Sequence, residues 1–135
     1  MNLVIPININ LEEEFVEDIL VTVLEGGSNY WIKDIRINHP GGAKPKGVPS
    51  SIWASQALIN DGSVIFKTGE EKTETLTIGA FHNGLLVWAE HHPRQVASAI
   101  FVECGMTPTL DASNLDANDA DAILQYALFG KLVYG

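Results

Sequence analysis

The sequence predicts an α+β fold, in which a small antiparallel or mixed sheet with a hairpin packs against about four helices. Segments with apolar residues three or four positions apart alternate with short segments rich in β-branched and aromatic residues. The predicted order is strand, helix, several strands, helices and strand. The 135 residues, 46% of them hydrophobic, suffice for one globular domain spanning residues 1–135.

Short strands are expected where β-branched or alternating apolar residues occur without helical spacing. They cover residues 3–9, 28–37, 52–59, 63–68, 75–78 and 132–134. Asp61-Gly62 lies between two of these runs, and this dipeptide is a strong hairpin signal. Pro6 favours an edge position for the first strand, because proline cannot donate a ladder hydrogen bond.

Helices are expected where apolar residues recur with helical spacing. They cover about residues 11–25, 78–92 and 94–104, and the stretch between Asp116 and Gly130. Asn10, Thr77 and Asp116 are the expected N-caps, since short polar side chains accept hydrogen bonds from the first helical turn. Glycines at 26, 27 and 130 are the expected stops. Residues 38–50, 69–74 and 105–116 are predicted to be loops.

The charge balance argues against two classes of partner. Eight Lys and Arg face seventeen Asp and Glu, giving a net charge of −9 at pH 7. General nucleic-acid binders and proteins on anionic membranes gather positive charge, so we expect neither here. Residues 30–50 are the exception, with four cations and one acid: Lys33, Arg36, Lys44 and Lys46 against Asp34. This basic island is either a site for an anionic ligand or a solvated loop.

Cysteine usage and the first residues predict the compartment. Cys104 is the one cysteine, so an internal disulfide is impossible, as is common in a reducing cytosol. Its apolar surroundings predict a small, inert, helical side chain. The stretch MNLVIPININ lacks the charged start and long apolar run of a signal peptide. We therefore expect a soluble, cytoplasmic protein.

No motif predicts metal or covalent chemistry. His82 and His91 are nine residues apart, a spacing that turns them to different sides of one helix, and His92 with His91 suits the helix end. The aspartates in DASNLDANDAD lack the glycine and distal glutamate of a calcium loop. A Gly-x-Ser-x-Gly elbow is absent, and Gly41-Gly42-Ala43-Lys44 lacks phosphate-loop spacing. We expect no cofactor, no metal and no catalytic residue.

Two segments combine glycines, polar groups and large aromatics at unusual density: EGGSNYW at 25–31 and DADAILQYALFGKLVYG at 119–135. Tyr and Trp are enriched at recognition surfaces, so these segments form either a binding surface or a shared core. In these residues the chain resembles a family of small uncharacterised bacteriophage and prophage proteins. The resemblance implies a phage or prophage source and a bacterial cytoplasm, without a settled activity.

We therefore expect a non-enzymatic accessory protein that acts by binding, with antagonism of a host defence system as its role. Its partner is expected to be a host protein or a small anionic ligand. The expected binding residues are Ser28, Asn29, Tyr30, Trp31, Lys33, Arg36, Lys44 and Lys46. Two alternatives are a small hydrolase that uses a histidine with a carboxylate, and a virion or assembly component. An exposed Tyr30–Trp31 pair and a terminal strand edge would also favour a homo-oligomer.

Overall fold

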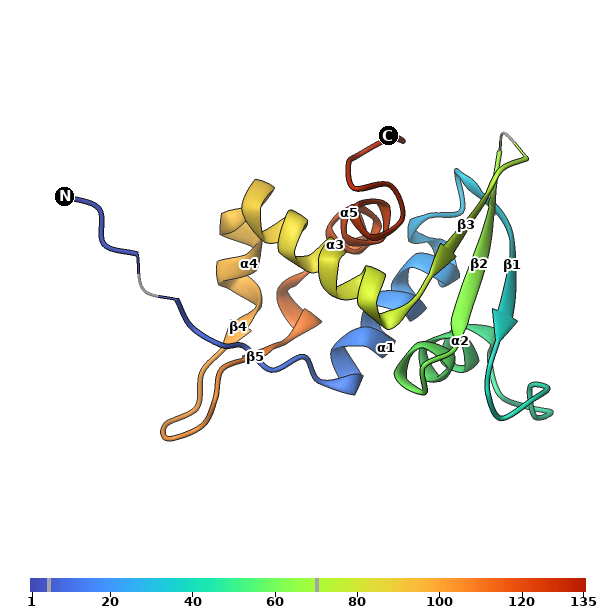
Figure 1. Cartoon of the computed structure of the whole chain (residues 1–135), viewed down its shortest axis with the longest axis horizontal. Coiled ribbons are helices and arrows are strands. Elements are labelled where there is room, and N and C mark those ends of the chain that lie inside the picture. The colour runs from blue at the N-terminus through green and yellow to red at the C-terminus, as the bar shows by residue number, and fades with distance from the viewer. Residues whose placement is uncertain (5, 70) are drawn as a thin grey trace.

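The computed structural model describes residues 1–4, 6–69 and 71–135, and these residues form an α+β fold. Figure 1 shows the three-stranded sheet at one end of the molecule, with an extended N-terminal arm and a small two-stranded hairpin at the other. The α-helices of the described residues lie mostly between these ends. They are α1 (Glu13–Thr22), α2 (Ser50–Ile59), α3 (Ile78–His91), α4 (Pro93–Ala99) and α5 (Ala117–Phe129). The predicted fold class is confirmed.

The main sheet is antiparallel with the order β1-β2-β3. Its strands are β1 (Ile32–Asn38), β2 (Ser63–Thr68) and β3 (Thr73–Leu76). Ile35 pairs with Phe66 and Ile37 with Val64, so these apolar side chains share the face that packs on the core. Strands β2 and β3 form a hairpin in place of the one expected around Asp61-Gly62. Glu70, which lies between them in the sequence, is outside the described residues.

The predicted strand at 52–59 is wrong, because this segment is the helix α2. Small and apolar side chains at positions 51, 54, 55 and 58 are buried with helical spacing, and α2 packs on α1. Asp61 takes a left-handed φ of 62°, and Gly62 N donates to the carbonyl of Ala57 at 2.7 Å. The Asp-Gly dipeptide thus ends a helix instead of turning a hairpin.

The first helix begins later than predicted. Asn10 is not its cap; Asn10 N donates to Pro108 O and forms a bridge with Thr109. Helix α1 starts at Glu13 and continues into the wide turn η1 (Val23–Gly27), where Gly26 has a φ of 147° that few other residues adopt. Residues 28–31 turn back before β1, which shortens the predicted strand at 28–37.

Helix α3 and the last helix follow their predicted caps. Thr77 Oγ1 accepts from Ala80 N at 3.2 Å, and α3 covers the predicted range to within a residue. Asp116 and Asp119 form a reciprocal capping box at the start of α5. Gly130 ends α5 in the left-handed conformation. These three predictions are confirmed.

The remaining differences lie near the ends of the chain. Helix α4 stops at Ala99, because the chain becomes extended in β4 (Ile100–Phe101) and pairs with β5 (Thr109–Leu110). The loop predicted at 105–116 thus contains β5 and a short helix η2 (Ala112–Asn114), and Cys104 is exposed in the hairpin connection. Residues 132–134 are irregular, and the described part of residues 3–9 forms no strand. Ile5 lies outside the described residues.

Candidate functional site

The two unusual segments meet at the carboxylate of Asp121, which is buried on α5. Ser28 Oγ donates to its Oδ1 at 2.6 Å, and the indole Nε1 of Trp31 donates to the same oxygen at 2.7 Å. The Tyr30 hydroxyl and Gln125 Nε2 donate to Oδ2, the latter at 2.9 Å. Both carboxylate oxygens are therefore saturated by donors from within the chain.

The C-terminal residues complete this cluster. Gln125 Oε1 accepts from Val133 N at 2.8 Å and Tyr134 N at 2.9 Å, which folds the chain back over α5. The ring of Tyr134 then stacks on Trp31 at a centroid distance of 5.1 Å and an interplanar angle of 5°. Trp31 is only 2% exposed, so the exposed Tyr30–Trp31 pair expected for self-association does not exist. The terminal strand edge expected for the same purpose is absent from residues 132–134.

This cluster uses the polar atoms of three expected binding residues internally. Ser28 and Trp31 are buried, and Tyr30 is half exposed with its hydroxyl bound to Asp121. Partial burial of the phenol, with the Asp121 hydrogen bond and charge, raises the pKa of Tyr30 to about 12. The phenol is therefore a neutral donor at neutral pH.

Asn29 and Lys33, two further expected residues, line an open cavity of about 310 Å³ between β1 and the first turn of α2. We call this cavity the β1–α2 cleft. Its other polar lining residues are Glu25, Asp34, Ser50 and Ser51, and its apolar lining residues are Leu24, Ile32 and Ile35. Carboxylates, an ammonium, an amide and hydroxyls thus converge on one space.

Three irregularities of the backbone border the β1–α2 cleft. The wide turn η1 supplies Glu25, and a register shift between Ile32 and Asp34 marks a bulge in β1. Helix α2 begins after Pro49 without a side-chain cap, which leaves its first N–H groups without side-chain partners. Wide turns and bulges are common beside functional sites because they redirect side chains.

The polar atoms of the cleft are only partly used. Ser51 Oγ donates to Glu25 Oε1 at 3.1 Å, and Asp34 Oδ1 accepts from Ile35 N at 2.9 Å. The second oxygen of each carboxylate remains available to accept a hydrogen bond from a ligand. Lys33 is exposed at the cleft.

The rest of the basic island lies on other parts of the same end. Arg36 is exposed on the face of β1 opposite Ile35 and pairs in register with Ile65 of β2. Lys44 and Lys46 are exposed in the loop after β1, where Lys44 Nζ donates to Val48 O at 2.6 Å. The fold therefore brings Asn29 and Lys33 to one cavity and leaves Arg36, Lys44 and Lys46 outside its lining.

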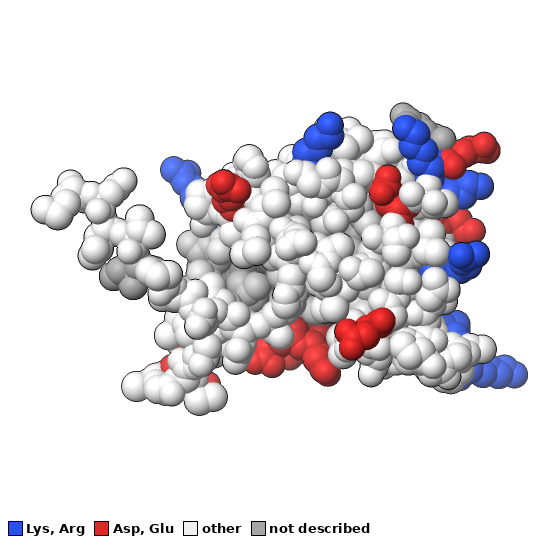
Figure 2. Space-filling model, viewed as in Figure 1, with Lys and Arg blue, Asp and Glu red and all other residues white. Residues whose placement is uncertain are grey.

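Charge is strongly separated along the molecule. Residues 30–76 hold six of the eight Lys and Arg with five acids, whereas the remaining residues hold two cations and twelve acids. In Figure 2 most blue atoms gather at the end that carries the sheet. The expected basic island is thus extended by two lysines of the β2–β3 hairpin, Lys67 and Lys72.

The acidic part includes a cluster beside α1. Partial burial raises the pKa of Asp18, and the charges of Glu14, Glu17 and Asp111 raise it further. Four carboxylates thus lie close enough to repel one another, which costs stability.

His91 and His92 both contact Tyr126, whereas His82 lies apart from them. His92 Nε2 and Tyr126 OH form a hydrogen bond of 2.9 Å, and the His91 ring stacks on Tyr126. His82 faces a different cavity beside the N-terminal arm, as the helical spacing predicts. In the part of the chain that the structure describes, no group of three or more His, Cys, Asp or Glu could hold a metal ion.

Sequence reasoning missed Glu25, Asp34, Ser50 and Ser51 as members of the site. Pro49 followed by two serines is a common start of a helix, and this signal could have located the α2 end of the cleft.

No helix within the described ranges is long and apolar enough to span a membrane. Comparisons with protein-family models, curated proteins and solved structures found no match to this chain.

Proposed function

We propose that this protein acts by binding, and that it holds a small anionic ligand in the β1–α2 cleft. The observation that carries this proposal is the convergence of Lys33, Asn29 and the uncapped first turn of α2 on one cavity. An ammonium and free backbone N–H groups at a helix start both favour a phosphate or carboxylate. The cavity volume is at the lower end of the range for small-molecule sites.

The carboxylates of Glu25 and Asp34 determine which groups the ligand should have beside its anionic group. They accept hydrogen bonds and repel negative charge, so the ligand should present hydroxyl or amino groups toward them. A phosphorylated sugar or nucleotide has this combination, with an anionic end and several hydroxyl donors. Arg36, Lys44 and Lys46 would raise the local concentration of such an anion without touching it.

The biological setting of the proposal comes from the resemblance to phage and prophage proteins. A protein that binds a small anionic signal and does not consume it would lower the free concentration of that signal in a bacterial cytoplasm. This activity would antagonise any host defence system that depends on the signal. It also requires no catalytic group.

A basic host protein is the second candidate partner, and the carboxylate cluster beside α1 favours it. Repulsion around Asp18 would be relieved by a partner's Lys or Arg. Such a partner would contact the acidic part of the surface and leave the β1–α2 cleft open.

The test is a titration with adenosine 5′-monophosphate, followed by the backbone amide signals in NMR. Lys33→Glu should weaken binding about tenfold or more, since a charge-assisted hydrogen bond contributes about 1.5–3 kcal/mol. Lys131→Glu makes the same charge change on an exposed residue beyond α5 and should leave affinity within about twofold. Signals of Asn29, Lys33 and Ser51 should move most. Equal losses in both variants, or shifts confined to α1, would contradict the cleft as the site.

A further inference from the structure

The described residues of the N-terminal arm, 1–4 and 6–9, include apolar side chains that are largely exposed. Leu3 is 81% exposed, Val4 84% and Ile7 58%. Figure 1 shows the arm running away from the body, on the side opposite the sheet. Isolated exposed apolar residues are ordinary, but a series on one extended segment indicates an interaction site.

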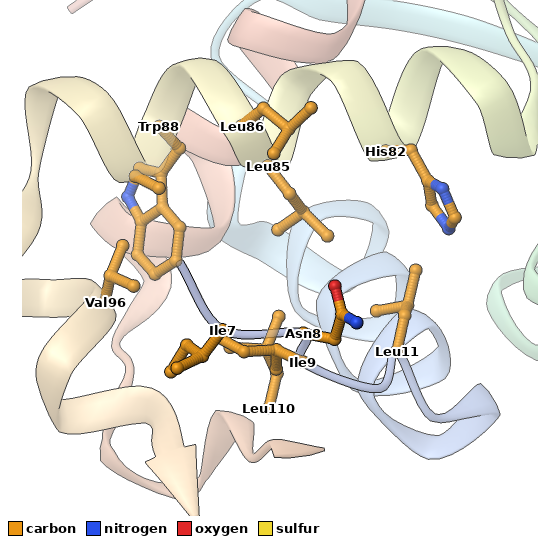
Figure 3. A pocket seen from close by; sticks show the side chains of 11 residues that line it. Ile7, Asn8, Ile9, Leu11, His82, Leu85, Leu86, Trp88, Val96 and Leu110 are labelled. Carbon is orange, nitrogen blue, oxygen red and sulfur yellow. The ribbon is translucent and has the colours of Figure 1, made fainter. Parts of the chain in front are cut away.

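An apolar cavity of about 330 Å³ lies at the base of this arm. Figure 3 shows Ile7 and Ile9 of the arm on one side of it, and Leu85 and Trp88 of α3 on the other. We call it the arm–α3 cavity. The molecule therefore carries both an extended apolar segment and an apolar cavity beside it.

Further exposed apolar side chains lie on α3 and on the β4–β5 hairpin, whose Leu110 lines the arm–α3 cavity. Leu86 of α3, which borders the cavity, is exposed, and so are Phe101, Val102 and Met106 of the hairpin. With the three arm residues they offer about 500 Å² of apolar surface, at roughly 100 Å² for a fully exposed side chain. A standard interface buries about 800 Å² per partner, of which roughly 60% is apolar. The apolar area thus matches what one half of a stable dimer needs.

The charge distribution favours a second copy as the occupant. Residues 1–11 contain no Asp, Glu, Lys or Arg, and residues 100–110 contain only Glu103. Two chains of net charge −9 repel over most of their surfaces, but among the side chains of the arm and the β4–β5 hairpin only Glu103 is charged. Phe101 borders the acidic residues Glu12, Glu14, Asp18 and Asp111, so the neutral contact is confined to the arm and α3. Figure 2 shows the described part of the arm free of both charge colours.

We propose that two copies of this chain form a two-fold dimer, in which the arm of each copy packs into the arm–α3 cavity of the other. Leu3 and Val4 supply the inserted side chains, and Leu85 and Leu86 form the receiving surface, with the buried Trp88 behind them in the cavity wall. Two-fold symmetry places the arm of each copy in the cavity of the other, and the assembly closes at two copies. The sheet end, with the β1–α2 cleft, stays exposed on each copy.

Sedimentation equilibrium of the purified protein over a concentration series tests this dimer. The wild type should sediment with twice the chain mass. Leu3→Asp with Val4→Asp should sediment as a monomer, and so should Leu86→Asp on the receiving side. Leu132→Asp with Val133→Asp introduces two acids at apolar positions elsewhere, each 49% exposed, and should leave the dimer intact. Because the changed side chains are exposed, all variants should keep the wild-type circular dichroism.

A spin label on Cys104 gives a second readout, because this one cysteine is exposed in the hairpin beside the arm. Pulsed dipolar spectroscopy should show a defined distance between two labels in the wild type and none in the arm variant. A monomeric wild type at every concentration would overturn the proposal. A dimer that survives both the arm and Leu86 substitutions would overturn it as well.

Discussion

The indole N–H of Trp31 donates at 2.7 Å to the carboxylate of Asp121, which lies 90 residues later in the chain. Trp31 precedes β1 and Asp121 lies on the second turn of α5, so the bond joins the start of the sheet to the last helix. Asp121 is a buried acid whose oxygens accept from three residues of the segment 28–31 and from Gln125. Charge-assisted hydrogen bonds of this kind are among the strongest available to a fold.

Asp121→Asn should destabilise the protein by about 3 kcal/mol. The amide nitrogen of asparagine is a donor, so it would face the donors of Ser28, Trp31 or Tyr30 and leave at least one of them unpaired and buried. Urea unfolding followed by tryptophan fluorescence measures the change. Asp61→Asn is the matched control, because Asp61 is exposed and asparagine tolerates its left-handed φ of 62°. A loss below about 1 kcal/mol at Asp121 would show that the carboxylate contributes little.

Tyr30 should make stability fall at high pH. Its pKa is raised to about 12 in the folded protein, whereas an unfolded tyrosine titrates near 10. The neutral phenol therefore stabilises the fold fully below pH 10, and this contribution is lost as pH rises from 10 to 12. Wild type should exceed Tyr30→Phe by about 1 kcal/mol at pH 8, and the difference should shrink through that interval. A difference that stays constant to pH 12 would disprove the role of the phenol proton.

Gly84 should be intolerant of alanine because α3 and α5 touch there. A Cβ at this position would lie 2.6 Å from the backbone N and Cα of Ala127. Gly84→Ala should therefore cost about 2 kcal/mol or more by forcing the helices apart. Gly79→Ala is the control on the same helix, because the nearest atom to its Cβ would be 3.8 Å away. That change should be neutral or stabilise by up to about 0.5 kcal/mol, and equal effects in thermal unfolding would contradict the close approach.

Local signals predicted those elements whose ends are fixed by side chains of the same segment. Thr77 and Asp116 cap α3 and α5 through residues three positions away, and Gly130 stops α5 by its own φ. Such contacts depend on sequence spacing alone. The end of α4 could not be found this way, because β4 pairs with β5 across a connection of seven residues.

The error at α2 has a different cause. Ile52 and Ile59 favour a strand by β-branching, and Asp61-Gly62 favours a turn. A left-handed residue ends a helix as well as it turns a hairpin, so the dipeptide does not distinguish the two. The segment is helical because Ser51, Ala54 and Leu58 are buried together in the core around α1. This packing is a tertiary interaction, so the local sequence pattern does not predict it.

The sequence predicted some of the residues that line the candidate site and missed others. Asn29 and Lys33 belong to a segment that is conspicuous by composition, and both line the β1–α2 cleft. Ser28 and Trp31 belong to the same segment but are buried against Asp121, since only the fold decides which side of a short turn faces inward. Ser51 comes from a helix that the local pattern did not predict.

The most direct test of the proposed binding function uses a bacterial metabolite extract. The protein would be dialysed against the extract, washed and denatured, and the released compounds identified by mass spectrometry. The proposal predicts one enriched anionic compound, released with unchanged mass, retained by Lys131→Glu and lost from Lys33→Glu. Release of a chemically altered compound would reveal turnover instead of binding, and equal retention by Lys33→Glu would place the ligand elsewhere. Either result would contradict the account.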